Sequence, residues 1–286
     1  MRKLCLILLA ILLTSCGEKR IADKERFVLK WYDSIEEARQ ISEAEKRPML
    51  LSFEVAWCPW CKVLRESLYA NPSVIDSLKE FVCVMIDSDR QKSIAADYGV
   101  SVFPTIVVTD SYGNELTRLI GLYSAEIFLK RLNQAKGNSD VLTEMYMQEP
   151  SNEQDPVFQL TFGKALAELG IYDGAILRFE KAAQIARTGG TGVLEEATFS
   201  IAEVLMLKGD YKRAADAFRH FAISFPNDQR AETALILAAR CYEEAANFKA
   251  SLQIYREYLS KYINGTYVLY ASMKARTLAG GTSSSR

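Results

Sequence analysis

The chain has 286 residues, a length typical of two globular domains, and 49% of them are hydrophobic. Charged residues make up 25% and the formal net charge is −1, so the sequence lacks the basic surface that nucleic-acid binding requires. There is one histidine, His220, which excludes a multi-histidine metal centre. A Ser-His-Asp or Cys-His-Asn site would have to use this residue, which lies in a predicted helix.

The first residues have the pattern of a secretory signal. Arg2 and Lys3 precede ten apolar residues, from Leu4 to Leu13. Because ten helical residues span about 15 Å, roughly half of a bilayer core, the segment is too short for a transmembrane anchor.

The signal ends in "LTSC", which resembles the lipobox of bacterial lipoproteins. The resemblance implies that residues 1–15 are removed, that Cys16 is lipidated and that residues 16–26 form a tether. Gly17 resembles the residue found in lipoproteins sent to an outer membrane. The alternative is an ordinary signal peptide with an incidental cysteine. On either interpretation the mature protein leaves the cytosol for a compartment in which disulfides form.

Strand and helix patterns alternate beyond the tether. Strands are predicted at 27–32, 48–55, 82–87, 103–110 and 116–121, and helices at 34–47, 61–69, 74–81, 91–99 and 124–135. Ser34 is a candidate N-cap of the first helix, and Glu37 three residues later completes the pattern of a capping box. This alternation predicts an α/β domain whose sheet has a parallel core and helices on both faces.

Cys58 and Cys61 lie where the second predicted strand gives way to a helix. A c-type haem site needs a histidine after the second cysteine, and Lys62 stands there instead. A structural zinc site needs four ligands, but Cys83 lies on a predicted strand and Cys241 in the other domain. A structural disulfide across so short a loop would constrain the unfolded chain little. The pattern therefore favours a redox-active pair, with no metal or other cofactor.

The position of the pair assigns a role to each cysteine. A helix N-terminus stabilises a thiolate through its dipole and free backbone N–H groups, so Cys58 is the expected attacking sulfur. Cys61, one turn later and more shielded, is expected to resolve the mixed disulfide. Pro59 suits the first helical position. Trp57 and Trp60 flank the pair, either as packing residues or as an apolar lip against which a substrate peptide rests.

Two motifs together resemble the thioredoxin superfamily. "WCPWCK" follows a buried strand, and "YGVSVFPTIVVTDSYGNEL" begins about forty residues later. The resemblance covers residues 27–137 and implies a thioredoxin-like α/β fold with a central mixed sheet. It also implies a cis peptide bond before Pro104, facing the cysteines, where proline excludes a metal-binding side chain. The backbone of Phe103 would pair there with an extended substrate.

The sequence departs from this family at one position. Classical thioredoxins carry a buried aspartate six residues before the first cysteine, where this chain has Ser52. Glu54 lies on the same strand and faces the same side, because side chains alternate along a strand. A carboxylate near Cys61 would accept its proton through a water molecule. The alternative is that Glu54 is only a polar residue at the strand end.

The C-terminal half shows helical periodicity without strand patterns. A turn-rich linker is predicted at 138–155, helical repeats at 156–278 and a disordered tail at 279–286. Three segments, 166–182, 204–221 and 241–258, can be aligned. The aligned positions hold Tyr172, Tyr211 and Phe248, then Ala175, Ala214 and Ser251, then Phe179, Phe218 and Tyr255.

The first aligned positions lie 39 and then 37 residues apart. This pattern resembles tetratricopeptide repeats, whose period is about 34 residues, and three copies are about the minimum for a stable stack. Cys83 and Cys241 occupy apolar periodic positions and are predicted to be buried free cysteines. His220 is predicted to lie on a solvated or partly packed helix face.

Two functions are compatible with these features. The first is a lipid-anchored, extracytoplasmic thiol–disulfide oxidoreductase that acts on protein thiols and disulfides, with a membrane electron donor or acceptor and a partner held in the groove of the repeats. The second is a binding scaffold in which the repeats carry the function. Intact Cys58, Cys61 and Pro104 favour the enzyme. The uncharged Pro59 and Trp60 between the cysteines favour a reductase or isomerase.

Overall fold

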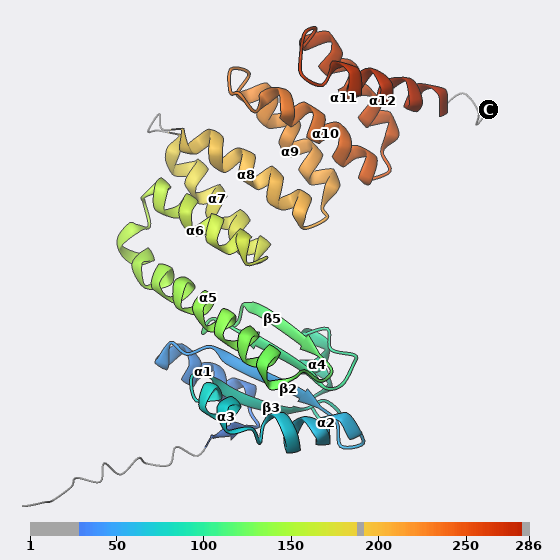
Figure 1. Ribbon diagram of the computed structural model, residues 1–286. Coiled ribbons are helices and arrows are strands. Elements are labelled where there is room, and N and C mark those ends of the chain that lie inside the picture. Colours follow the sequence, from blue (N-terminus) through green and yellow to red (C-terminus); the bar gives the residue numbers. More distant parts are fainter. Residues whose placement is uncertain (1–28, 188–191, 282–286) are drawn as a thin grey trace, which may run out of the picture.

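The computed structural model describes residues 29–187 and 192–281, which form a sheet domain followed by a stack of helices (Figure 1). The expected signal peptide, the expected lipidation site Cys16 and the expected tether lie outside the described residues. Within 29–187 and 192–281, no helix is both long and apolar enough to cross a bilayer.

The sheet domain has one mixed five-stranded sheet in the order β1-β3-β2-β4-β5. Its strands are β1 (Trp31–Tyr32), β2 (Met49–Glu54), β3 (Val82–Asp87), β4 (Thr105–Thr109) and β5 (Glu115–Ile120). β1 and β2 both pair with β3 in parallel, whereas β2 with β4 and β4 with β5 are antiparallel. The predicted fold class, a mixed sheet with a parallel core, is therefore confirmed.

Helices cover both faces of this sheet. They are α1 (Ile35–Glu45), α2 (Pro59–Val63), the π-helical turn η1 (Leu64–Leu68), α3 (Pro72–Leu78), α4 (Lys92–Asp97) and α5 (Ala125–Asn152). The side chains of β2 alternate between the faces. Leu51 and Phe53 pack with residues of α1 and α4, and Leu50 packs with residues of η1, α3 and α5. Ser52 and Glu54, two and four residues after Leu50, therefore lie on the face covered by η1.

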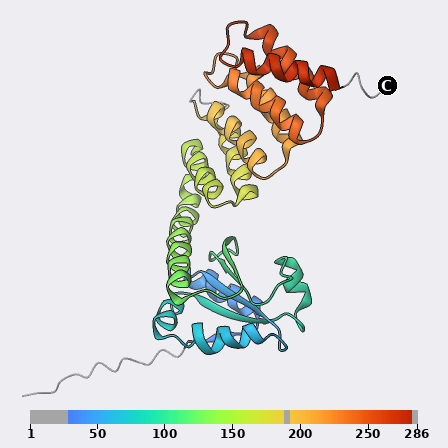
Figure 2. The same cartoon turned by 45° about the vertical axis from the view of Figure 1, so that its right-hand side comes forward.

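Helix α5 occupies most of the segment that the sequence predicts to be a turn-rich linker. Residues 138–155 were expected to be turn-rich, but α5 continues unbroken to Asn152 and contains Pro150. The helix continues because its buried residues recur at helical spacing on both sides of residue 138, where the domain was expected to end. These residues are Phe128, Leu132, Ala135, Ser139 and Leu142. Tertiary packing outweighs the low helix propensity of the "GNSD" segment. Figures 1 and 2 show α5 running from the sheet domain to the helical stack in both views.

A hairpin turn of the sheet domain contacts α5 close to the stack. The rings of Tyr112, in the β4–β5 turn, and Tyr146, on α5, have centroids 4.0 Å apart. Asn114 Nδ2 donates a hydrogen bond to Tyr146 Oη at 3.2 Å. The buried carboxylate of Asp110 accepts bonds from the backbone N–H groups of Tyr112 and Asn114 and so holds the turn in place.

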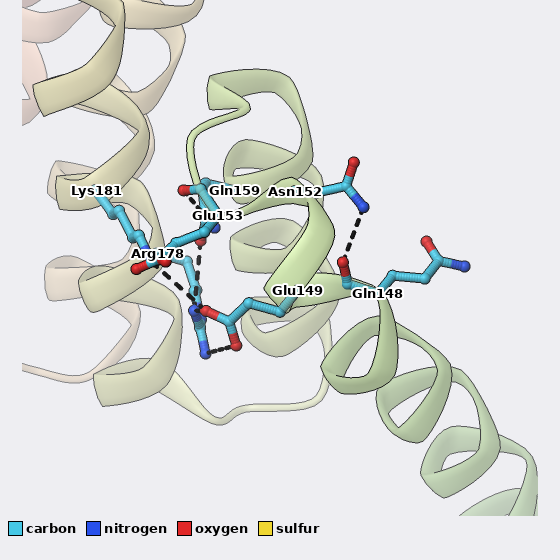
Figure 3. A network of polar contacts seen from close by, with 7 residues as sticks. All are labelled: Gln148, Glu149, Asn152, Glu153, Gln159, Arg178 and Lys181. Carbon is cyan, nitrogen blue, oxygen red and sulfur yellow. Dashed lines mark hydrogen bonds and ion pairs between the residues drawn. The ribbon is translucent and has the colours of Figure 1, made fainter.

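The C-terminal end of α5 is tied to the stack by charged side chains (Figure 3). Arg178 forms a two-pronged ion pair with Glu149, with Nη2 donating to Oε2 at 2.9 Å. The Arg178 guanidinium also lies 4.5 Å from the ring centroid of Phe162, a cation–π contact. Lys181 Nζ donates to Glu153 Oε1 at 3.1 Å. These contacts join the C-terminal end of α5 to α7 (Tyr172–Ala186).

The helical stack consists of antiparallel helices that pack on their neighbours in chain order. They are α6 (Pro156–Glu168), α7 (Tyr172–Ala186), α8 (Val193–Leu207), α9 (Tyr211–Ser224), α10 (Ala231–Glu244), α11 (Phe248–Lys261) and α12 (Val268–Gly281). The disordered tail predicted to begin at residue 279 therefore begins too early, because α12 continues to Gly281, and 282–286 lie outside the described residues.

The three aligned segments occupy equivalent places in this stack. Tyr172, Tyr211 and Phe248 are the first residues of α7, α9 and α11. The small residues and the aromatic residues that follow them are buried in all three helices: Ala175, Ala214, Ser251, Phe179, Phe218 and Tyr255. The repeat visible in the sequence is therefore a repeat of packing, in which a small residue allows close helix contact and an aromatic ring fills the adjoining space.

Candidate functional site

The cysteine pair lies where β2 ends and α2 begins, at the carboxyl end of a central strand. Cys58 is the N-cap of α2, and its Sγ accepts a hydrogen bond from the backbone N–H of Cys61 at 3.0 Å. The two residues form a disulfide, with Cα atoms 5.3 Å apart. Cys58 keeps 6% of its surface exposed and Cys61 none, so a partner can reach only the first sulfur.

A cis peptide bond joins Phe103 to Pro104, as the resemblance implied. Phe103 packs against the small apolar cluster of Val55, Cys58 and Cys61, which places this loop beside the disulfide. The two tryptophans beside the pair are largely exposed, and the Trp57 ring also contacts the ring of Phe103. Trp57 is 69% exposed and Trp60 is 62% exposed, so both present apolar surface to solvent around the pair.

Glu54, the last residue of β2, belongs to a buried polar network and is 3% exposed. Ser52 Oγ donates to Glu54 Oε1 at 3.1 Å, and Tyr69 Oη donates to Ser52 Oγ at 2.9 Å. Arg65 Nη1 donates to the other carboxylate oxygen, Oε2, in an ion pair. Burial raises the pKa of Glu54, and the positive charge of Arg65 opposes that rise.

The comparison with protein families identifies the first domain. A family model described as a thioredoxin-like domain matches residues 35–136. Residues 35–136 form a thioredoxin-like domain. The match contains the cysteine pair, the cis proline and the network around Glu54, so all the features described above belong to this domain.

Curated relatives match the same region. The thiol:disulfide interchange protein DsbD of Campylobacter jejuni is 23% identical over 114 residues, which are 39% of this chain and 20% of that protein. DsbD of Vibrio vulnificus is 29% identical over 110 residues, 35% of this chain and 18% of the relative. The thiol:disulfide interchange protein TxlA of Synechococcus elongatus is 24% identical over 128 residues, 41% and 67% of the two chains. The chain thus matches about a fifth of the length of the DsbD relatives.

Solved structures match the thioredoxin-like domain as well. A thioredoxin from Thermus thermophilus has 27% identity and a TM-score of 0.37, covering 39% of this chain and 89% of that one. The C-terminal domain of Neisseria meningitidis DsbD in the oxidised form has 19% identity and a TM-score of 0.33, covering 37% and 99% of the two chains.

The structure adds two residues to the site that sequence reasoning missed. Arg65 and Tyr69 lie on predicted helix 61–69, and neither was singled out there. A signal for Arg65 was available, because it follows Cys58 by seven residues and two helical turns return a side chain to the same face. Tyr69 carried no such signal. It contacts Ser52 after the π-helical turn η1, whose wider turn changes the helical spacing from which the facing residues would be predicted.

The two free cysteines, Cys83 and Cys241, are buried away from the site, on β3 and α10. Burial raises the pKa of Cys83 to about 12 and that of Cys241 to about 11. At pH 8 their thiolate fractions would be about 10⁻⁴ and 10⁻³, so both should be unreactive.

After mild reduction of the folded chain at pH 8, iodoacetamide is expected to label Cys58 first, because it is the more accessible member of the pair. Cys61 should react much more slowly, and Cys83 and Cys241 only after unfolding in denaturant. Peptide mass spectrometry measures each site. Equal labelling of Cys58 and Cys61 in the folded chain would contradict the assigned roles.

Proposed function

We propose that the chain is a thiol–disulfide oxidoreductase that exchanges the Cys58–Cys61 disulfide with cysteines of other proteins. The observation that carries the proposal is the disulfide at the N-terminus of α2, with Cys58 partly accessible and Cys61 sealed behind it. The names of the relatives, thiol:disulfide interchange proteins, support this class of chemistry for the thioredoxin-like domain.

In the reducing direction, the Cys58 thiolate attacks one sulfur of a substrate disulfide and releases one substrate thiolate, leaving a mixed disulfide. Cys61 then gives its proton to Glu54 through a water molecule, and the Cys61 thiolate attacks the Cys58 sulfur. The bond between Cys58 and the substrate breaks, and the second substrate thiolate leaves. Two electrons have passed from the cysteine pair to the substrate, and the reverse sequence oxidises a substrate dithiol.

The surroundings of Cys58 would position a protein substrate. An extended segment would rest against the exposed rings of Trp57 and Trp60 and pair with the backbone of Phe103. Pro104 presents no metal-binding side chain to the sulfurs, and Pro59 begins α2 without leaving a backbone donor unpaired.

The direction of electron flow in this proposal is reduction or isomerisation. Pro59 and Trp60, the two residues between the cysteines, carry no charge. The pair itself carries the electrons, so the reaction needs no cofactor beyond the disulfide. The electrons would come from or go to a membrane donor or acceptor. The name of the DsbD relatives, thiol:disulfide interchange protein, supports a redox partner in general.

The proposal also places the protein outside the cytosol, anchored by lipid at Cys16 to a bacterial membrane and facing the periplasm. The "LTSC" sequence that ends at Cys16 supports it. The stack α6–α12 would hold a protein partner in its groove and so bring a substrate to the cysteine pair.

The competing function is a binding scaffold in which the stack is the active part and the thioredoxin-like domain is a docking module. The observation in its favour is that the stack makes up close to half of the chain while its one cysteine in the described part, Cys241, is buried.

An insulin-reduction assay with dithiothreitol as donor tests the proposed function. The full chain is expected to accelerate precipitation of the insulin B chain well beyond the donor alone, because an activated thiolate at Cys58 attacks disulfides faster than dithiothreitol does. A rate equal to that of the donor alone would leave the scaffold as the function. An equilibrium measurement against glutathione then sets the direction, and a strongly oxidising value would reverse the assignment as reductase or isomerase.

A further inference from the structure

Arg65 is the positive charge in contact with Glu54. It follows Cys61 by four residues, so the two side chains project from the same face of the helix. Cys61 is fully buried beneath that face, and the Arg65 side chain reaches down to the carboxylate while remaining about half exposed. Arg65 therefore lies one helical turn after the second cysteine, and its ion pair with Glu54 joins a half-exposed side chain to a buried one.

The Glu54 carboxylate is held from two directions. Ser52 donates to one oxygen and Arg65 to the other, which fixes the orientation of the carboxylate plane. Tyr69 stays protonated, because burial raises its pKa well above the usual value, so it can donate continuously to Ser52. Each carboxylate oxygen has a second lone pair, which leaves Glu54 able to accept one more proton donor.

A cavity of about 410 Å³ lies against this ion pair and is lined by both Glu54 and Arg65. The other ionisable groups around it are Asp33, which follows β1, and Asp87, which pairs in register with Glu54 on β3. The substrate-side residues Trp57, Trp60 and Phe103 do not line it. The cavity can therefore keep Glu54 in exchange with solvent while a substrate covers Cys58.

The positive charge of Arg65 favours the ionised form of Glu54. Burial raises the pKa of Glu54, and the charge of Arg65 is the largest influence that lowers it, followed by the hydrogen bond from Ser52. Removing the charge would raise the pKa of Glu54 further, and a protonated carboxyl cannot take a proton from Cys61.

We propose that Arg65 is a positioning residue that keeps Glu54 ionised and oriented to receive the proton of Cys61. This inference rests on the proposed oxidoreductase function. Arg65 touches neither cysteine nor substrate, and it acts through Glu54. It affects only the step in which Cys61 loses its proton and attacks the Cys58 sulfur, and not the first attack by Cys58.

A reaction that separates these two steps tests the inference. The reduced full chain is mixed with dithiobis(nitrobenzoate), an aromatic disulfide. Cys58 attacks it and releases one coloured thionitrobenzoate, and then Cys61 attacks Cys58 and releases the second, so two electrons pass to the reagent. Stopped-flow absorbance gives the rate of each release across a range of pH. Cys61→Ser, which can release only one equivalent, assigns the two phases.

Arg65→Gln is expected to leave the first phase unchanged and to slow the second phase at pH values below its midpoint, where each unit of rise in the Glu54 pKa lowers the ionised fraction about tenfold. The pH at which the second phase reaches half of its maximal rate should move upward. Glu54→Gln should slow the second phase at least as much and remove this pH dependence. Arg65→Lys, which keeps the charge, should hold the midpoint close to that of the parent chain.

The matched control is Arg90→Gln. Arg90 is an exposed arginine that pairs with Asp87, a residue of the same cavity, without contacting Glu54. Its second phase should equal that of the parent, which separates the specific contact from a general loss of positive charge.

Three outcomes would overturn the inference: a parent-like second phase and midpoint in Arg65→Gln, an equal slowing in Arg90→Gln, or a midpoint shifted as far in Arg65→Lys as in Arg65→Gln. A different outcome would overturn the proposed function itself, namely that the parent chain releases no second equivalent or that Cys58 reacts no faster than a free thiol. The first phase in each variant also reports whether the domain has folded around the cysteines.

Discussion

Cys58→Ser is expected to reduce insulin-reduction activity to the uncatalysed level, a loss of about 10³-fold or more, because a serine hydroxyl is neither ionised at neutral pH nor able to form a disulfide. Cys61 cannot replace it, since it is fully buried behind the first position. The assay is the same insulin precipitation with dithiothreitol, run at equal protein concentration. The variant should keep the fold, because a serine can accept the N-cap hydrogen bond now made to Cys58.

Two further variants show whether the loss of activity in Cys58→Ser is specific to the catalytic pair. Cys61→Ser should also lose turnover, but it should accumulate mixed disulfides with substrates through Cys58, visible as bands that dissociate on reduction. Cys83→Ala removes a buried free cysteine of the same domain and should keep full activity. If Cys58→Ser retained the parent rate, the pair would not be the catalytic group. If every variant were inactive yet still bound partners, the scaffold function would be favoured.

Phe162→Ala is expected to lower the free energy of unfolding of the helical stack by about 3–5 kcal/mol, the usual cost of removing a buried aromatic ring. Phe162 is fully buried on α6. Its ring packs edge-on against Tyr146 of α5 at 4.9 Å and beneath the guanidinium of Arg178 at 4.5 Å. The substitution therefore removes packing at the point where α5, α6 and α7 meet.

Urea unfolding followed by two signals measures this effect. Far-ultraviolet circular dichroism is dominated by the helices, whereas all three tryptophans, Trp31, Trp57 and Trp60, lie in the sheet domain and report on it by fluorescence. The dichroism midpoint should fall more than the fluorescence midpoint. Phe248→Ala is the control, because Phe248 is 51% exposed and its loss should change stability by about 0.5 kcal/mol or less. Unchanged dichroism midpoints for Phe162→Ala would contradict the structural role of this junction.

Local sequence patterns were sufficient for most of the secondary structure and for the central pair of the site. Cys58 and Cys61 could be placed at the start of a helix because a buried strand and an amphipathic helix each leave a clear periodicity. The same holds for the repeats, since the equivalent residues of α7, α9 and α11 follow one another at nearly constant spacing. The roles of these residues in the reaction stay predictions until the experiments above are done.

The linker shows where local patterns mislead. Gly137, Asn138, Ser139 and Asp140 have low helix propensity, and the sequence around them predicts a turn. The structure keeps them in α5, because Ser139 and Leu142 continue the buried stripe that begins at Phe128. One end of α5 packs in the core of the sheet domain and the other end in the core of the stack. The free energy gained by this packing outweighs the low helix propensity of the segment between them.

Local sequence patterns were enough to predict an α/β domain with a cysteine pair at a helix N-terminus, followed by repeated helices, because these features depend on neighbours close in the chain. Three features became visible only in the folded molecule: Cys61 is fully buried while Cys58 keeps some exposed surface, Arg65 and Ser52 hold the buried carboxylate of Glu54, and one continuous helix joins the two domains. These contacts join residues on different elements, and their energies depend on desolvation and packing that no local pattern records.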